Sequence, residues 1–214
     1  MLKFYHAPWS RSSGILWLLE ELGAEYEIVP IDIRAEGGVP DDYRHIQPNG
    51  KVPAIEHDGA VVIERPAISI YLADAFPQAG LAPAIGDVDR GPYLSMLVYC
   101  AAVFDPCITA RARGMVYESN DFAFGLFDDM LAYLERVLTD RPFAAGDRFT
   151  AADVQLASSI DFTMNNIHVL PERQPFKDYL ARIGTRPALA RSQEIDTDLA
   201  KTVPFFQKMF AQQG

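Results

Sequence analysis

The chain has 214 residues, of which 49% are hydrophobic and 22% charged, so it can bury a sizeable core and is not expected to be disordered. Its formal net charge is −10 and it has no run of lysine or arginine, which argues against a nucleic-acid-binding surface. The N-terminus lacks the apolar segment of a signal peptide, and no uninterrupted apolar run reaches membrane-spanning length. We therefore expect a cytoplasmic protein without a membrane span. Cys100 and Cys107, too far apart on a predicted helix for a disulfide, are expected to be small buried residues.

Strand and helix signals alternate through the first third of the chain. The predicted elements are a strand at 2–6, a helix at 12–22 ended by Gly23, a strand at 26–33, a hairpin at 52–64 with Asp58-Gly59 as its turn, and a helix at 66–76. This order predicts a small α/β unit with a thin core.

Strand signals almost vanish after a segment rich in proline, glycine and alanine at 76–87. Helical patterns then cover 90–112, 122–138, 150–167, 175–184 and the C-terminal segments. In FTAADV, Thr150 and Asp153 have the spacing of a capping box, and Phe149 and Val154 that of a hydrophobic staple. We predict an α/β domain at 1–78, a linker at 79–88 and an all-helical domain at 89–214.

Two short motifs suggest a binding site in the α/β domain. In GKVPAI, Pro53 lies between a loop and a strand: it is either an ordinary trans proline or a cis proline that presents the Val52 backbone to an extended ligand. Glu64 and Arg65 lie where a strand meets a helix N-terminus, a place suited to a carboxylate, although a solvated charge pair is the alternative.

The loop APWSRSS, residues 7–13, places three hydroxyls and one guanidinium directly before an apolar helix. It either caps that helix or forms a site where the helix start holds an anion and a serine does chemistry. The histidines at positions 6, 45, 57 and 168 lack metal-ligand spacing, so we expect no metal site. The sequence also lacks the motifs of a serine-hydrolase nucleophile and of a phosphate-binding loop.

Taken in order, these motifs resemble the cytosolic glutathione transferases, most of all bacterial and fungal members with a Ser-Arg pair before the first helix. The resemblance covers nearly the whole chain. It implies a thioredoxin-like N-terminal domain, an all-α C-terminal domain and a homodimer. It also implies glutathione as co-substrate, with its thiolate attacking a small hydrophobic electrophile and no metal involved.

The resemblance also implies roles for individual residues. Ser10 is the first candidate for stabilising the thiolate, followed by Ser12 and then Tyr5. The glutathione peptide would be held by Lys51, Val52, Pro53, Glu64 and Arg65, and the resemblance predicts that the Val52–Pro53 bond is cis. Arg65 replaces a serine found in many members. The wall of the second-substrate site would include Trp9, Tyr99, Phe104, Ile108, Arg111 and Met115, for each of which ordinary packing is the alternative.

Three functions fit this resemblance. The first is an enzyme that conjugates glutathione to an electrophile or uses it as a reductant. The second is a non-catalytic binding or regulatory protein of the same fold, which the replacement at Arg65 makes more credible. The third is a glutathione-dependent isomerase or dehalogenase.

Overall fold

The computed structural model describes residues 1–211. The chain forms two compact units: Met1–Leu72 together with the segment from Arg186 onward, and Ala73–Thr185. The last two helices therefore belong to the same compact unit as the N-terminal part of the chain. The predicted domains at 1–78 and 89–214, with a linker at 79–88, divide the chain by sequence and stay a prediction.

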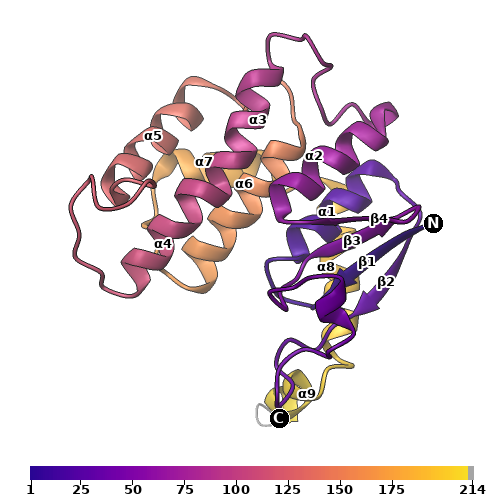
Figure 1. Ribbon diagram of the computed structural model, residues 1–214. Helices are drawn as coiled ribbons and strands as arrows, with labels where there is room; N and C mark the ends of the chain where they lie inside the picture. The colour runs from indigo at the N-terminus through magenta and orange to yellow at the C-terminus, as the bar shows by residue number, and fades with distance from the viewer. Residues whose placement is uncertain (212–214) are drawn as a thin grey trace. The chain divides into compact units, whose positions relative to one another are not determined.

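The first unit is built on a four-stranded mixed sheet (Figure 1). Its strands are β1 (Leu2–His6), β2 (Tyr26–Pro30), β3 (Ala54–His57) and β4 (Ala60–Ile63), in the order β2-β1-β3-β4. β1 is parallel to β2 and antiparallel to β3, and β3 and β4 form the predicted hairpin. Its turn residues Asp58 and Gly59 both have positive φ, 50° and 86°, which is why Asp-Gly suits this position.

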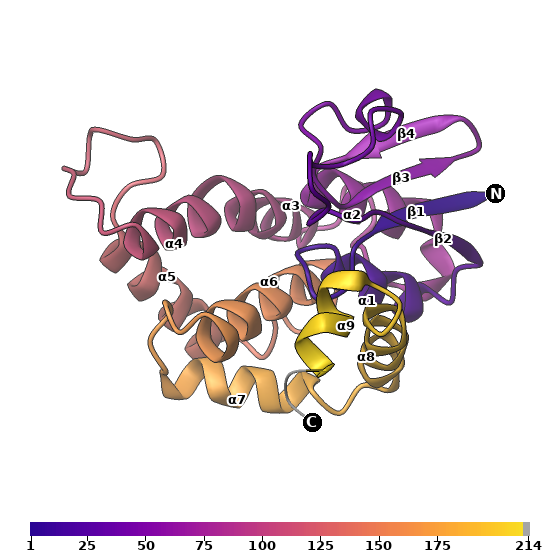
Figure 2. The same ribbon diagram turned by 90° about the horizontal axis from the view of Figure 1, so that it is seen from below.

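The helical elements associated with this sheet are α1 (Ser13–Leu22), α2 (Arg65–Ala75) and a 3-10 turn at Tyr43–His45, and the end of the chain adds α8 (Pro187–Ala200) and α9 (Pro204–Ala211). The apolar face of α1 is buried, and the helix ends at Gly23 in the left-handed conformation (φ 61°), as predicted. α8 lies alongside α1, as both views show (Figure 1 and Figure 2). Because α8 presents the buried residues Ser192, Asp196 and Ala200, it brings a carboxylate from the end of the chain into this unit.

The second unit is helical. It contains a 3-10 turn at Pro77–Ala79, α3 (Arg90–Tyr99), a π turn at Cys100–Phe104, α4 (Asp105–Ala112), α5 (Phe127–Asp140), α6 (Ala151–Asp161), a π turn at Phe162–Asn166 and α7 (Gln174–Ile183). The helix predicted at 122–138 begins only at Phe127, because Gly125 adopts a positive φ of 69° and Leu126 is extended. Cys100 and Cys107 are free and buried, as expected.

The predicted capping box is confirmed at the start of α6. Thr150 Oγ1 accepts from the Ala152 N–H, and Asp153 Oδ2 accepts from the Thr150 N–H at 2.8 Å. Asp153 Oδ1 also accepts from the Ala144 N–H and from the Tyr179 hydroxyl. The buried carboxylate therefore joins three segments of the helical unit.

The helix that runs from Arg90 to Ala112 is long and apolar enough, by length and composition, to cross a membrane. It contains no uninterrupted apolar run of that length, because Ser95 and Asp105 interrupt its apolar residues. A core helix of a soluble protein passes the same test, and 44% of the apolar 18-residue window within this helix is buried inside the protein. The absence of a membrane span stays a prediction.

Candidate active site

The loop between β1 and α1 does not use Ser12 as a side-chain cap. Ser12 occupies the cap position, but the first-turn amides of Ile15 and Leu16 donate to its main-chain oxygen, at 2.9 and 3.1 Å. Its Oγ turns back toward the end of β1, where it lies 2.7 Å from His6 Nδ1 and 3.3 Å from the Ala7 N–H. The Ser12 side chain therefore does not cap α1.

Ser10 is half-buried, as Ser13 of the same loop also is, whereas Ser12 is fully buried. Ser10 Oγ donates to the Ala7 carbonyl at 2.7 Å and accepts from the Ser12 N–H at 3.1 Å, the local turn that serines favour before a helix. It also lies 2.8 Å from Ser12 Oγ. Ser10 is thus the partly exposed end of a row of polar contacts that leads inward.

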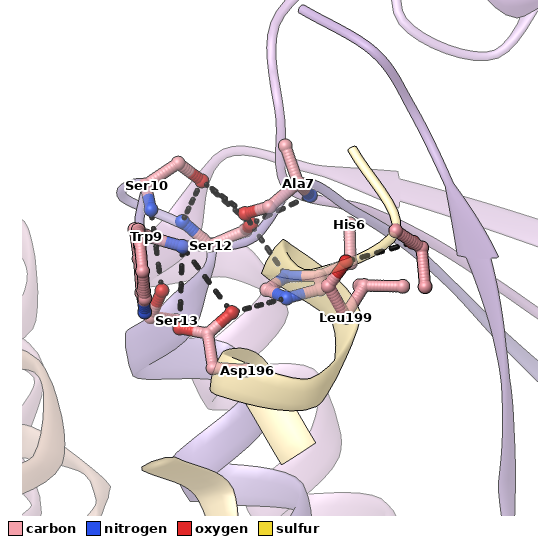
Figure 3. Close-up of polar contacts among 9 residues, drawn as sticks. His6, Ala7, Trp9, Ser10, Ser12, Ser13, Asp196 and Leu199 are labelled. Carbon is pink, nitrogen blue, oxygen red and sulfur yellow. Dashed lines mark hydrogen bonds and ion pairs between the residues drawn. The ribbon is translucent and has the colours of Figure 1, made fainter. Parts of the chain in front are cut away.

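The inner end of this row is His6, the last residue of β1. Its imidazole is fully buried and stacks on the Phe4 ring, with 4.9 Å between ring centroids. Nε2 lies 2.9 Å from Asp196 Oδ1, on α8 and 190 residues further along the chain. The Trp9 N–H donates to both Asp196 oxygens, at 3.2 and 3.3 Å, so the carboxylate joins α8 to the loop (Figure 3).

Sequence reasoning missed both of these inner residues. In the sequence His6 stands out only as one of four histidines without metal-ligand spacing, although a histidine that ends an apolar strand directly before a serine loop is itself a signal. Asp196 lies with Ser192 and Ala200 at four-residue spacing on the buried face of α8. Small and polar residues at this spacing indicate a helix face that packs closely on another element of the fold, but they do not indicate which element.

Tyr5 does not join the serines. Neighbouring residues of a strand point to opposite faces, so Tyr5 faces away from His6 and packs beside Tyr43, with ring centroids 5.5 Å apart. Its hydroxyl donates to Glu56 Oε2 at 3.1 Å. Burial, and then the Glu56 carboxylate, raise the pKa of Tyr5, so these contacts oppose the phenolate form.

The loop before β3 has the predicted cis peptide bond between Val52 and Pro53. The preceding Lys51 is exposed, while its backbone is fixed at both ends: its carbonyl accepts from the Tyr43 hydroxyl at 2.6 Å and its N–H donates to Gln47 Oε1 at 3.2 Å. The Lys51 side chain is thus presented from an anchored backbone.

Glu64 and Arg65 lie where β4 meets α2. Glu64 is exposed and has a positive φ of 67°, a conformation uncommon for a residue other than glycine. Arg65 is already the first residue of α2 and is only 9% exposed, so it is not a solvated surface cation.

Trp9, the first of the predicted substrate-wall residues, is 38% exposed. Its ring meets Phe206 and Phe210 of α9 edge to face, with centroids 4.7 and 5.7 Å apart. The Arg34 guanidinium lies 4.6 Å from the Phe206 ring centroid. Aromatic residues of α9 therefore cover the loop directly before Ser10.

The other predicted wall residues belong to the helical unit. Phe104 and Ile108 are buried, and Tyr99 packs on a neighbouring tyrosine with centroids 4.7 Å apart. The Arg111 guanidinium lies 5.2 Å from an aromatic ring of α5. Met115 is 46% exposed and helps to line an open apolar hollow of 340 Å³ on this unit. A role in substrate binding stays a prediction for all of them.

Residues 1–211, the part of the chain that the structure describes, contain no group of three or more histidine, cysteine, aspartate or glutamate side chains arranged to hold a metal ion. The polar site of the first unit is instead built from hydroxyls, one imidazole and one carboxylate.

Comparison with known proteins identifies the family. Residues 1–74 match the glutathione S-transferase N-terminal domain, and residues 117–196 match the C-terminal domain. The chain is 30% identical to glutathione S-transferase GstA of Escherichia coli O157:H7, over 87% of this chain and 94% of that protein. It is 27% identical to glutathione S-transferase 3 of Schizosaccharomyces pombe, over 88% and 85% of the two chains.

A solved structure supports the same assignment. A sphingomonad glutathione S-transferase complexed with glutathione superposes with a TM-score of 0.72 and 28% identity, over 91% of this chain and 98% of that one. The predicted fold class is thereby confirmed: a thioredoxin-like α/β part followed by a helical part. This chain belongs to the glutathione S-transferase family of enzymes.

Proposed function

We propose that the protein binds glutathione as its co-substrate and activates the glutathione thiol through the Ser10 hydroxyl. The observation that carries the proposal is the pair of serines. Ser12 is fully buried and bonded inward, whereas Ser10 is half-buried, and we infer that a ligand reaches its hydroxyl. The known glutathione complex of a related sphingomonad enzyme supports the choice of ligand.

A hydroxyl at this place favours the charged form of a nearby sulfur. A free thiol has a pKa of about 8.5, and a hydrogen-bond donor near a helix start lowers it. A decrease of roughly two units corresponds to about 2.7 kcal/mol and makes the thiolate the main species at neutral pH. Ser10 lies just before α1, so the positive end of that helix acts in the same direction.

The rest of glutathione would be held by the loop before β3 and by the start of α2. We assign the Val52 main chain, next to Pro53, to the cysteinyl residue of the peptide. Lys51 reaches a carboxylate, while Glu64 and Arg65 hold the γ-glutamyl end. A charged hydrogen bond of this kind contributes about 1.5–3 kcal/mol.

The thiolate then attacks a small hydrophobic electrophile, in a conjugation or in a glutathione-dependent reduction. The enzyme accelerates this step by supplying the thiolate and by holding the two reactants close together. Trp9, which lies directly before Ser10, is the aromatic residue best placed in the first unit to contact such a substrate.

The test is the absorbance of the bound thiolate as a function of pH. Ser10→Ala should raise the pKa of bound glutathione by about one unit or more and lower the rate below neutral pH about tenfold. Tyr5→Phe is the matched control. It also removes one hydroxyl from a residue near the end of β1, but that hydroxyl donates to Glu56 and not to the serine loop. Binding of S-methylglutathione should stay unchanged in both variants. An unaltered titration in Ser10→Ala would refute the assignment.

A further inference from the structure

Four polar groups form an unbroken row from the half-buried Ser10 to the interior of the first unit. Ser10 Oγ lies 2.8 Å from Ser12 Oγ, Ser12 Oγ lies 2.7 Å from His6 Nδ1, and His6 Nε2 lies 2.9 Å from Asp196 Oδ1 (Figure 3). Each distance is that of a hydrogen bond. Two of these residues, His6 and Asp196, have no part in the proposed contact with glutathione.

The partners fix the direction of the hydrogen bonds. A carboxylate only accepts, and Asp196 already accepts from the Trp9 N–H, so the proton of a neutral His6 ring belongs on Nε2. Nδ1 is then an acceptor, and the Ser12 hydroxyl, which also lies 3.1 Å from the Ala7 carbonyl, donates to Nδ1 across the shorter distance of 2.7 Å. Ser12 Oγ accepts in turn from the Ala7 N–H and can accept from Ser10. The row thus leads protons inward and ends at a base.

We propose that this row is a proton relay that carries the proton of the glutathione thiol to His6, with Asp196 as the counter-ion. The proposal rests on the proposed contact between Ser10 and the sulfur. The S–H bond breaks and its proton goes to Ser10 Oγ; the Ser10 proton goes to Ser12 Oγ; the Ser12 proton goes to His6 Nδ1. The products are a thiolate and an imidazolium, and no proton leaves the protein.

The transfer reverses the hydrogen bonds between the sulfur and His6 Nδ1, whereas His6 Nε2–H donates to Asp196 before and after it. Afterwards His6 Nδ1–H donates to Ser12, Ser12 donates to Ser10, and Ser10 donates to the thiolate. The electron pair of the broken S–H bond stays on sulfur, and the positive charge on the ring faces the Asp196 carboxylate, which is itself 5% exposed. A histidine oriented by a carboxylate and bonded to a hydroxyl is a known general-base arrangement. His6 and Asp196 are positioning residues here, since they act on the sulfur only through the serines.

The Ser10 hydroxyl can change partners without moving its oxygen. The Ala7 carbonyl and Ser12 Oγ lie at nearly equal distances from it, 2.7 and 2.8 Å. In the absence of a thiol it donates to Ala7. When a thiol donates to Ser10 Oγ, rotation of the hydroxyl toward Ser12 connects the relay.

Counting protons tests the relay. Glutathione is added to the enzyme at about pH 6.5, roughly two units below the ordinary thiol pKa, in weak buffer with an indicator dye. Thiolate absorbance gives the amount of thiolate, and the dye gives the protons released to solvent. S-methylglutathione, which has no thiol, gives the background release. The wild-type enzyme should release clearly fewer protons than the number of thiolates it forms. One proton released per thiolate would overturn the relay.

Asp196→Asn removes the counter-ion while keeping nearly the same shape and an oxygen for the Trp9 N–H. The thiolate fraction should fall about tenfold, one unit of pKa, and each remaining thiolate should release one proton. S-methylglutathione affinity should not change, which separates this effect from a structural one. The control Asp198→Asn makes the same change on an exposed side chain of α8 that pairs with Lys201, and should behave like wild type. Wild-type values in Asp196→Asn would overturn the proposal.

Two further measurements keep the outcomes distinct. His6→Asn retains an acceptor for the Ser12 hydroxyl but no base, so it should resemble Asp196→Asn. If either variant fails to fold, the other and the wild-type proton count decide. If Ser10→Ala leaves the thiolate unchanged, the proposed function itself fails. If Ser10→Ala abolishes the thiolate but wild type releases one proton for each, the Ser10 contact stands and only the relay is wrong.

Discussion

A fork of two hydrogen bonds between Arg186 and Glu21 holds the start of α8 against α1. Arg186 Nε lies 2.5 Å from one carboxylate oxygen and a terminal nitrogen lies 2.6 Å from the other. The Glu21 side chain is only 6% exposed and also accepts from the Trp17 indole N–H at 2.9 Å. Removing the guanidinium therefore leaves a nearly buried carboxylate without its cation. We predict that Arg186→Met destabilises the protein, although methionine keeps much of the apolar stem.

The size of the effect follows from exposure. Breaking a buried ion pair by removing one partner costs about 3–5 kcal/mol, because the remaining charge is desolvated. Arg186 is 35% exposed, so water reaches Glu21 once the guanidinium is gone, and the loss should be smaller. We expect about 2–3 kcal/mol, a large part of a total stability of roughly 5–15 kcal/mol.

Urea unfolding followed by far-ultraviolet circular dichroism measures the loss as a lower midpoint at an unchanged slope. Arg191→Met is the matched control on the same helix: Arg191 lies 3.5 Å from Glu194 with both side chains mostly exposed, and it should cost less than about 0.5 kcal/mol. Adding Glu21→Gln to Arg186→Met should restore much of the loss, because no unpaired charge remains. Equal losses in Arg186→Met and Arg191→Met would refute the reasoning.

Three further predictions concern the ligand, pH and assembly. Arg65→Ala should weaken glutathione binding about tenfold to a hundredfold in calorimetric titration, the effect of losing a charged hydrogen bond; an unchanged dissociation constant would exclude that contact. Burial, and then Asp153, raise the pKa of Tyr179 well above its ordinary value, so its contribution to stability is complete below about pH 10 and is lost as the pH rises further. Tyr179→Phe should flatten the alkaline decline in unfolding free energy. Sedimentation should give twice the chain mass of 23.8 kDa, and a monomer at micromolar concentration would contradict the predicted homodimer.

Features governed by neighbours in sequence could be predicted well. The Asp58-Gly59 hairpin turn requires positive φ at both residues, and few pairs other than Asp-Gly or Asn-Gly adopt it readily. The capping box needs only Thr150 and a carboxylate three residues later, at Asp153. The cis form of Pro53 could not be derived from its spacing alone, and it was predicted because of the family resemblance.

The polar row could not be predicted in the same way. Ser12 has the residue type and the place of a helix cap, and only the fold shows that its side chain turns to His6. Asp196 lies 190 residues from His6, and its role depends on how α8 packs on α1. The packing of the last two helices with the α/β unit is likewise a tertiary property, since their sequence reads simply as helix.

The composition of this row argues for chemistry rather than for packing. Burying an imidazole, a carboxylate and a hydroxyl costs free energy that apolar side chains would not, and a satisfied buried network often adds little net stability over apolar side chains of the same volume. A network that only held α8 to α1 would not need a partly exposed hydroxyl at one end. The Arg186–Glu21 ion pair already holds these two helices together. This row instead ends in the Ser10 hydroxyl, half-buried, with two alternative acceptors at nearly the same distance. A hydroxyl that can change its hydrogen-bond acceptor while its oxygen stays in place contributes little to rigidity. Such a hydroxyl is what the removal of a proton from a bound thiol requires.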